Sequence, residues 1–184
     1  MTIQKTSSYL KNIPDTLTVI HQRKSVRNFN GDPVTREQMD ILLKAAMAAP
    51  SAVNCQPWEF IVVFERTTLD KLGNALPYTK MIYMAGGAII VCSLPSQAHN
   101  KFPEYAIIDS SLASQNILLA AEAIGLGAIW TAAYPYPDRM EAVRSILNIP
   151  PEIIPLNVIP IGHPTGSDKP KEKFKKEKVH YEVW

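Results

Sequence analysis

The first stretch of this 184-residue chain with side chains suited to chemistry is a short basic cluster, Arg23-Lys24-Ser25-Val26-Arg27. Guanidinium groups bind phosphate through paired hydrogen bonds, and a serine hydroxyl can donate one more. The cluster closes a predicted helix and lies just before an Asn30-Gly31-Asp32-Pro33 turn. A phosphorylated ligand is one interpretation. The other is a solvated helix end, because Lys and Arg also favour the C-terminal end of a helix.

A second candidate stretch is the polar loop Pro50-Ser51-Ala52-Val53-Asn54-Cys55-Gln56-Pro57, which has a proline at each end. It carries many hydrogen-bonding side chains and shows no periodicity. One interpretation is a turn in which Ser and Asn bond their own backbone. The other is a ligand-binding loop, and the loop alone does not decide between them.

Familiar catalytic sets are missing from the sequence. A serine hydrolase would carry G-x-S-x-G, which does not occur. The two cysteines, Cys55 and Cys92, have no C-x-x-C context. The histidines lie far apart and have no acidic partners at metal-ligand spacing; they are His21, His99, His163 and His180. Asp109 is the carboxylate most expected to be buried, held by hydrogen bonds rather than catalytic. If the protein is an enzyme, a cofactor must carry the chemistry.

Composition restricts the class of protein further. A chain that is 46% hydrophobic can form one domain with a sizeable core, and a formal net charge of +2 argues against nucleic acid or an anionic membrane as partner. The run from Met84 to Leu94 is roughly half the ~20 residues of a membrane helix. The first residues, Met1 to Lys5, show no apolar segment typical of a secretory signal. We therefore expect a cytoplasmic protein without zinc or disulfides.

The elements that must position these stretches alternate along the chain. Thr35 and Gln38 fit a capping box, and Val34 with Met39 fits a hydrophobic staple. The patterns predict helices at about 15–24, 35–49, 67 onward, 105–124 and 137 onward, and strands at 58–64, 88–93, 128–131 and 153–161.

Two features of this order bear on fold and ligand. A doubly wound parallel sheet would fit the alternation, but no G-x-G-x-x-G joins a strand to a helix, and Gly125-Leu126-Gly127 follows a helix instead. A nucleotide would therefore not be bound in the Rossmann manner. Pro155 and Pro160 predict that the last strand lies at a sheet edge or has a shortened ladder.

The C-terminal segment differs in composition from the rest of the chain. Lys169 to Lys178 holds six lysines and no aliphatic residue, and an apolar, aromatic end follows it: Val179, Tyr181, Val183 and Trp184. We expect this end to dock on a partner subunit.

Taken in order, the motifs resemble those of the FMN-dependent nitroreductase family from about residue 19 to 184. They are R-x-S-x-R at 23–27, A-P-S-A-x-N-x-Q-P-W at 49–58, Q-N-I-L-L-A-A at 115–121, G-L-G-A-I-W at 125–130, P-I-G-H-P at 160–164, and a Lys-rich ending in V-H-Y-x-x-W. The resemblance implies an α+β fold with a mixed, largely antiparallel sheet flanked by helices. It also implies a single domain over 1–184 and an intertwined homodimer with FMN at the subunit interface. The tail from about 165 to 184 would wrap around the partner.

The same resemblance assigns roles to particular residues. Arg23, Lys24, Ser25 and Arg27 match the first FMN-binding segment. Arg23 and Ser25 would serve the phosphate and ribityl end, and Arg27 the N1/O2 edge of the ring. A cation at that edge stabilises the negative charge of the reduced flavin.

Other matching residues complete the implied site. The loop contributed by the second subunit corresponds to Pro50, Ser51, Ala52, Asn54 and Gln56. The segment facing the ring corresponds to Ile129, Trp130 and Thr131. The C-terminal phosphate contacts correspond to Gly162, His163 and Lys173. Family members often carry Arg where Lys24 and Lys173 stand, and a Lys binds phosphate as a point charge rather than a fork.

The resemblance implies ping-pong reduction of nitroaromatic, quinone or similar flat acceptors by NADH or NADPH. One alternative is an FMN-binding member that stores or senses the flavin. Another is a specialised branch such as dehalogenation or flavin destruction, which the short segment between Ser93 and Tyr105 disfavours because those branches usually add a lid.

Overall fold

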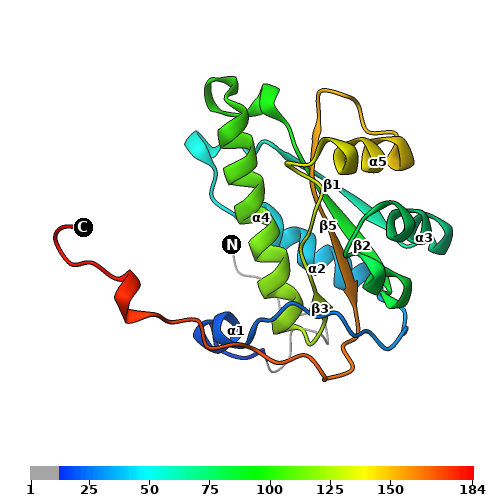
Figure 1. Cartoon of the computed structure of the whole chain (residues 1–184), viewed down its shortest axis with the longest axis horizontal. Helices are drawn as coiled ribbons and strands as arrows, with labels where there is room; N and C mark the ends of the chain where they lie inside the picture. Colours follow the sequence, from blue (N-terminus) through cyan, green and yellow to red (C-terminus); the bar gives the residue numbers. More distant parts are fainter. Residues whose placement is uncertain (1–12) are drawn as a thin grey trace.

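The computed structural model describes residues 13–184, so the expectation about a secretory signal at Met1 to Lys5 lies outside the described part. Five α-helices and five strands make up the fold in that range, with short 3₁₀ turns between them (Figure 1). The bounds are α1 Thr16–Gln22, α2 Arg36–Met47, β1 Trp58–Val63, α3 Arg66–Ala75, β2 Gly87–Ser93, α4 Pro103–Ala123, β3 Gly127–Ala128, β4 Thr131–Ala132, α5 Pro137–Leu147 and β5 Ile154–Gly162.

The strands form a single antiparallel sheet in the order β1-β2-β5-β3, and β4 also pairs with β5. The two central strands, β2 and β5, are buried on both faces for nearly their whole length. Such strands are apolar throughout rather than alternating, as the run Ala88-Ile89-Ile90-Val91 is. The predicted α+β fold with a largely antiparallel sheet is confirmed.

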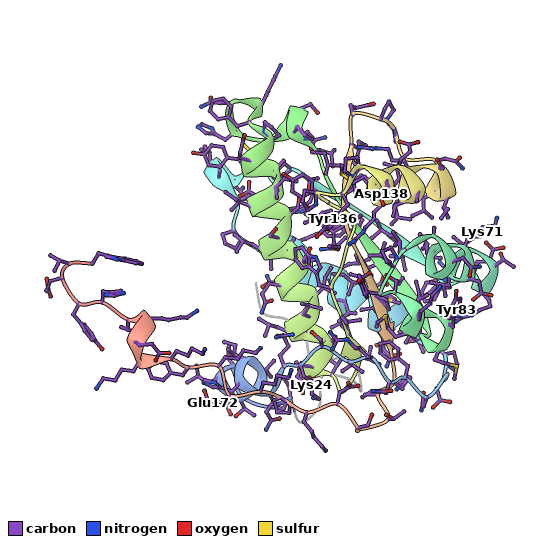
Figure 2. The ribbon with its side chains drawn as sticks, viewed as in Figure 1. Lys24, Lys71, Tyr83, Tyr136, Asp138 and Glu172 are labelled. Carbon is purple, nitrogen blue, oxygen red and sulfur yellow. The ribbon has the colours of Figure 1, made fainter. Side chains whose placement is uncertain are left out.

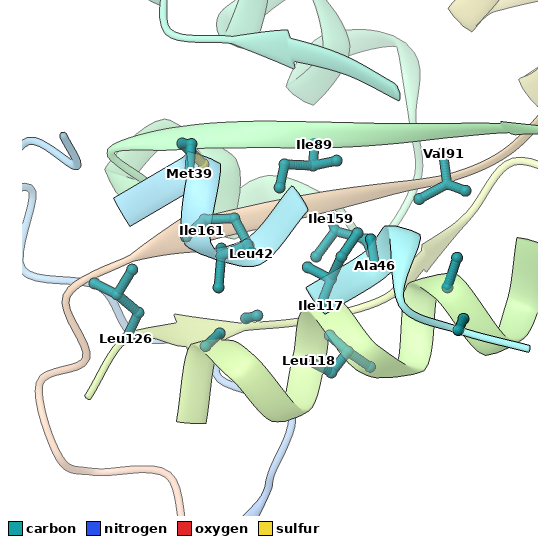
Figure 3. Packing of buried hydrophobic residues seen from close by; sticks show 14 of the residues in the cluster. Met39, Leu42, Ala46, Ile89, Val91, Ile117, Leu118, Leu126, Ile159 and Ile161 are labelled. Atoms are coloured by element: carbon teal, nitrogen blue, oxygen red, sulfur yellow. The ribbon is translucent and has the colours of Figure 1, made fainter. Parts of the chain in front are cut away.

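Helices cover both faces of the sheet. Because side chains alternate along a strand, successive residues join the cores on opposite faces. Odd-numbered residues of β2, such as Ile89, pack with α2 and α4, whereas even-numbered ones, such as Ile90, pack with α3 and α5. Figure 3 shows Met39 and Leu42 of α2 on the first of these cores, together with Ile117 of α4. The structure is therefore three layers, with the sheet in the middle.

The start of α2 follows the sequence prediction closely. The Thr35 hydroxyl accepts from the Gln38 amide, and the Gln38 side chain accepts from the Thr35 amide, which forms the predicted capping box. Val34 and Met39 are both buried in the core beneath α2. This cap fixes where α2 begins; the helix ends at Met47, shortly before the Pro50–Pro57 loop.

Of the two alternatives predicted for the last strand, the edge position was wrong and the interrupted ladder is observed. β5 lies in the interior of the sheet, between β2 on one side and β3 and β4 on the other. The prolines are accommodated locally: the register with β2 shifts next to Pro155, and the pairing on the other side is interrupted opposite Pro160. The missing N–H groups thus fall at irregular points of the ladder. The predicted strand at 128–131 is accordingly two short strands separated by Ile129 and Trp130.

Helix α4 is buried on one side and apolar on the other. Its inner face contributes Ile117 and Ala121 to the core, both fully buried. Its outer face keeps Tyr105, Ile108 and Leu112 exposed at a spacing of one helical turn. A second apolar stripe on a 21-residue helix is more than a helix needs to pack against its own sheet.

The C-terminal segment leaves the body after β5, passes α1 and extends away from the domain (Figure 1). Its aromatic side chains are exposed, with Phe174 at 74% and Trp184 at 100% of their full accessibility. Within residues 13–184, no helix has the length and apolar character to cross a bilayer.

Candidate functional site

The Arg23–Arg27 stretch is extended backbone rather than the end of a helix. Helix α1 ends at Gln22, and Arg23 already has non-helical dihedral angles close to polyproline II, φ −54° and ψ 131°. The Val26 amide donates to the Ala128 carbonyl at 3.1 Å, and the Val26 side chain is buried. Because side chains alternate in extended chain, a buried Val26 directs its neighbours Ser25 and Arg27 outward.

Two glycines let this segment lie directly on the sheet. A Cβ at Gly127 would lie 2.6 Å from Val26 Cγ1 and 3.0 Å from Phe29 Cε1. A Cβ at Gly162 would lie 2.9 Å from Phe29 Cδ1. Only glycine fits such close approaches, so these two positions set the height of the basic segment above β3 and β5.

The chain after β5 returns alongside the basic segment. Pro164 and Phe29 form an isolated antiparallel bridge, flanked by the Asn30 amide donating to the His163 carbonyl at 3.0 Å and the Thr165 amide donating to the Asn28 carbonyl at 2.9 Å. Two segments more than a hundred residues apart in sequence thus run side by side.

Asp168 adds a further connection between the two segments. One of its carboxylate oxygens, Oδ2, accepts from the Arg27 amide at 3.0 Å, the Asn28 amide at 3.1 Å and the Asn28 side-chain Nδ2 at 3.2 Å. Gly166, with φ +85°, turns the chain between Thr165 and this contact.

The two segments line a cavity of about 450 Å³ that is partly open to solvent and strongly cationic. Six basic side chains and one carboxylate line it, together with Ser25, Ser167 and Pro170. Figure 2 shows Lys24 at the end of the molecule where the C-terminal segment passes α1. The charged residues of the lining are Arg23, Lys24, Arg27, Lys169, Lys171, Lys173 and Asp168.

Lys24 differs from the other basic residues of the cavity because it is already paired. Its Nζ donates to both carboxylate oxygens of Glu122 at 2.8 and 3.0 Å, and both side chains are largely buried. Glu122 lies in the last turn of α4. Lys24 therefore ties the basic segment to α4, and its charge is less available to a ligand than those of its neighbours.

The Pro50–Pro57 loop is held at the other end of α4. The Ala52 amide donates to both oxygens of the Asp109 carboxylate at 3.2 Å, and Asp109 is only 3% exposed. The Ser51 hydroxyl accepts from the Gln56 amide at 2.9 Å. Asp109 is buried as predicted, but its partner is this loop.

The backbone of this loop is unusually constrained. Val53, Asn54 and Gln56 have φ values of 52°, 58° and 53°. Left-handed dihedral angles at a β-branched residue such as Val53 are strained and cluster at functional sites. The first interpretation, a turn that bonds its own backbone, is confirmed by the Ser51–Gln56 bond, and the ligand-binding interpretation stays a prediction.

Within one chain the basic cavity and the loop do not meet. Asp109, which holds the loop, and Glu122, which holds Lys24, lie thirteen residues apart on α4. At the rise of an α-helix this separates them by about 20 Å. The structure brings together Arg23, Lys24, Ser25, Arg27 and Lys173, and leaves Pro50, Ser51, Ala52, Asn54 and Gln56 at the opposite end of α4.

The remaining predicted residues lie on the sheet beside the basic segment. Ile129 and Thr131 are buried, and the Thr131 hydroxyl donates to the Val158 carbonyl at 2.6 Å. Trp130 between them is partly exposed. Gly162 and His163 contribute through backbone packing and a carbonyl rather than as lining of the cavity.

Sequence reasoning missed several residues of the cavity. Lys169 and Lys171 join Lys173 there, whereas Lys175 and Lys176 do not line it. The alternation of the three lysines is a pattern that could have indicated them, because every second residue of an extended chain shares one side. Nothing local in the sequence indicates Asp168.

The titratable groups around the site add little catalytic potential. The Glu172 carboxylate accepts from the Phe174 and Lys173 amides, and these bonds hold its pKa below the ordinary value. Burial raises the pKa of Cys92 to about 12, so its thiol is unreactive at neutral pH. Both cysteines are free, and no cluster of three metal-ligating side chains occurs among residues 13–184.

Comparison with known proteins gives consistent matches over most of the chain. The model of the Nitroreductase family matches residues 20–82 and 75–163. A Methanothermobacter thermautotrophicus protein provisionally named NADH dehydrogenase/NAD(P)H nitroreductase is 43% identical over 170 residues, covering 92% of this chain and 88% of that protein.

Solved structures agree with these matches. A crystal structure of a Bacteroides thetaiotaomicron protein with the same provisional name is 48% identical, has a TM-score of 0.87, and covers 92% of this chain and 98% of its own. A provisionally named nitroreductase from Desulfovibrio desulfuricans, in complex with FMN, is 25% identical with a TM-score of 0.79, over 93% of this chain and 98% of its own.

Proposed function

This chain belongs to the nitroreductase family, and on that premise we propose that it is an FMN-dependent oxidoreductase that uses NADH or NADPH to reduce flat acceptors such as nitroaromatics and quinones. The observation that carries this proposal is the cationic cavity between the basic segment and the returning C-terminal segment. The names of the relatives and the FMN complex of the Desulfovibrio desulfuricans protein support it.

The chemistry of the cavity lining fits the phosphate end of FMN. Guanidinium and ammonium groups with a serine hydroxyl are the donors that phosphate prefers. Arg23, Ser25, Lys171 and Lys173 would hold the phosphate and the ribityl chain. Lys24, paired with Glu122, would act mainly by holding the segment in place.

When bound, FMN supplies the hydride and electron transfer chemistry, and the protein supplies binding and electrostatics. Arg27 lies at the open side of the same segment, where its charge would stabilise a negative charge on the nearby edge of a flavin ring. No side chain of the described site is required to act as an acid or base. We expect ping-pong kinetics, in which the oxidised nicotinamide leaves before the acceptor binds.

We further propose that the site is completed by a second copy of the chain. Asp109, which holds the strained Pro50–Pro57 loop, lies about 20 Å along α4 from Glu122, which holds the basic segment. Within one subunit the loop is therefore not part of the cavity lining. The outer face of α4 exposes Tyr105, Ile108 and Leu112, and an exposed apolar stripe on a helix is typical of an interface.

The tail fits the same dimer. Its aromatic end, with Phe174, Tyr181 and Trp184, stays exposed on its own body and would wrap around the partner subunit. Residues 1–184 would then form one domain, with 165–184 as the exchanged arm. A cytoplasmic location suits its two free thiols.

A spectroscopic test separates this activity from the flavin-storage alternative. Purified protein is reconstituted with FMN, reduced anaerobically with NADH or NADPH while the flavin absorbance is followed, and then mixed with a nitroaromatic or a quinone. Bleaching followed by reoxidation, with parallel double-reciprocal lines in steady state, is the expected result. Protein that binds FMN but is not reduced by either nicotinamide would favour storage, and protein that fails to bind FMN would refute the proposal.

The dimer is tested separately by mass in solution. A variant truncated after Lys173 keeps every basic residue of the cavity and loses the aromatic end. We expect full-length protein to sediment as a dimer. The truncated form should dissociate into monomers at protein concentrations at which the full-length chain is still dimeric. The matched control, K175A/K176A, changes the charge of the same tail without shortening it and should remain as dimeric as the full-length chain. Full-length protein that is monomeric throughout would contradict the completed site.

A further inference from the structure

The contact that fixes the C-terminal segment over the cavity is a carboxylate, Asp168. Its Oδ2 accepts from two successive backbone amides, Arg27 and Asn28, and from the Asn28 side chain. Two adjacent N–H groups of this kind are a common binding place for an anion. Here the protein fills that place itself, although the surrounding cavity is otherwise cationic.

Asp168 also makes the last hydrogen bonds between the tail and the body. Before it, Thr165 pairs with Asn28. After it, among residues 13–184, every hydrogen bond made by the tail is internal, such as those from Lys173 and Phe174 amides to Glu172. The lysines that line the cavity, Lys169, Lys171 and Lys173, all follow this point.

On the basis of the proposed function, we propose that Asp168 is a positioning residue that latches the tail, and that it thereby sets the preference of the site for phosphorylated flavin over riboflavin. Fixing Asp168 fixes the start of an extended run whose alternate lysines face the cavity. Without the latch the three ammonium groups belong to a loose chain, and ordering that chain on each binding event costs conformational entropy.

Asp168 is expected to affect the affinity for FMN in two opposite ways, and two substitutions separate them. As a negative charge beside a phosphate site, it repels the phosphate, so neutralising it should raise affinity for FMN. As an acceptor for three N–H groups, it places the lysines, so removing its oxygens should lower affinity. Asp168→Asn removes the charge and keeps an acceptor oxygen, whereas Asp168→Ala removes both.

The experiment measures FMN and riboflavin affinities of wild type, D168N and D168A by flavin fluorescence quenching. Loss of one well-placed charged contact is worth roughly tenfold in affinity. We expect D168A to bind FMN about tenfold or more weakly with riboflavin affinity unchanged, and D168N to bind FMN as tightly as wild type or more tightly. The slope of FMN affinity against salt should also decrease in D168A, because fewer lysines are engaged.

A second measurement does not depend on flavin at all. Hydrogen exchange of the segment around Arg27 and Asn28, in protein without FMN, should be slow in wild type and D168N and fast in D168A. The Asp15→Ala variant, which removes a carboxylate cap at the start of α1 and outside the cavity, serves as a control and should leave this segment protected.

The outcomes separate the possibilities. If wild type does not bind FMN, the proposed function is wrong and the selectivity role of Asp168 is wrong with it. If wild type binds FMN and D168A binds it equally well, only the latch is refuted. An equal loss of affinity for FMN and riboflavin in D168A would also overturn the proposal, because the effect would not be specific to the phosphate. D168N that binds FMN as weakly as D168A would overturn it as well, because the acceptor oxygen would then have no role.

Discussion

Replacing Arg23 and Arg27 together by alanine is expected to produce a folded protein that has lost most of its affinity for FMN. The Arg23 side chain makes no hydrogen bond or ion pair within the described residues, and Arg27 Nη1 makes a single long bond of 3.5 Å to the Ser25 carbonyl. The backbone of the segment is held by Val26 and Phe29 instead, which the variant keeps. The free energy of unfolding should therefore change by no more than about 0.5 kcal/mol.

The loss of affinity follows from the number of charged contacts removed. A hydrogen bond to a charged group is worth about 1.5–3 kcal/mol. The cavity is partly open to solvent, so the lower value applies, and two contacts amount to roughly 3 kcal/mol. Since each 1.4 kcal/mol is about a factor of ten, the dissociation constant for FMN should rise roughly 100-fold.

The assay is a titration of flavin-free protein with FMN, followed by quenching of flavin fluorescence, with thermal unfolding measured alongside by circular dichroism. The matched control is Lys175→Ala with Lys176→Ala, which removes two charges from the same tail outside the cavity. The control should bind FMN within about threefold of wild type, as expected for distant surface charges. A double arginine variant that melts normally and keeps the wild-type dissociation constant would refute the assignment of this cavity to the FMN phosphate.

The remaining predictions concern packing and titration. Gly127→Ala should lower the free energy of unfolding by about 1–3 kcal/mol, because its Cβ would lie 2.6 Å from Val26 Cγ1; unchanged denaturant melts would contradict this close packing. Asp109→Ala should cost about 1–3 kcal/mol by leaving the Ala52 amide without its acceptor, and hydrogen exchange at Ala52 should rise while the sheet stays protected. The thiol of Cys92, with its pKa raised to about 12, should resist a thiol reagent at pH 8 in native protein and react after unfolding. Because the thiol ionises first in the unfolded chain, stability should fall as pH rises from about 9 toward 12; rapid native labelling would show that it is accessible.

Much of the fold could be predicted because local patterns and packing point the same way. The capping box at Thr35 and the helical spacing after it determine α2 from neighbouring residues alone. The continuous apolar run Ala88 to Val91 indicates a strand buried on both faces, which is what a central strand requires. In each case the information lies within about ten residues of the element.

The position of β5 could not be predicted in this way. Pro155 and Pro160 suggest an edge when the strand is considered alone. Whether a proline is tolerated depends on which ladder position its missing N–H would occupy, and this is set by the partner strands. The register is a property of the assembled sheet, so the local pattern indicated an irregular ladder but not its place.

The same distinction applies to the candidate site. Residue types indicated the basic segment and the loop, and alternation could have indicated Lys169 and Lys171. The pairing of Lys24 with Glu122 joins residues 98 apart in sequence, so the residues around Lys24 do not predict it. The charge of Lys24, which matches the motif by position, is thus already paired within the chain.

The separation of the two motifs along α4 is the strongest structural reason to expect a second subunit. Both motifs belong to one proposed cofactor site, yet they are held at opposite ends of the same helix. The loop is held by Asp109 near the start of α4, and the basic segment is held by Glu122 in its last turn. A helix of this length cannot shorten to bring them together, since its rise per residue is fixed by its hydrogen bonds. A two-fold arrangement of two chains can place the loop of one beside the cavity of the other, because residues of a symmetric interface contact reciprocally. The exposed apolar stripe on the outer face of α4 fits this arrangement, since in the proposed dimer this helix would pack against both its own sheet and the second chain.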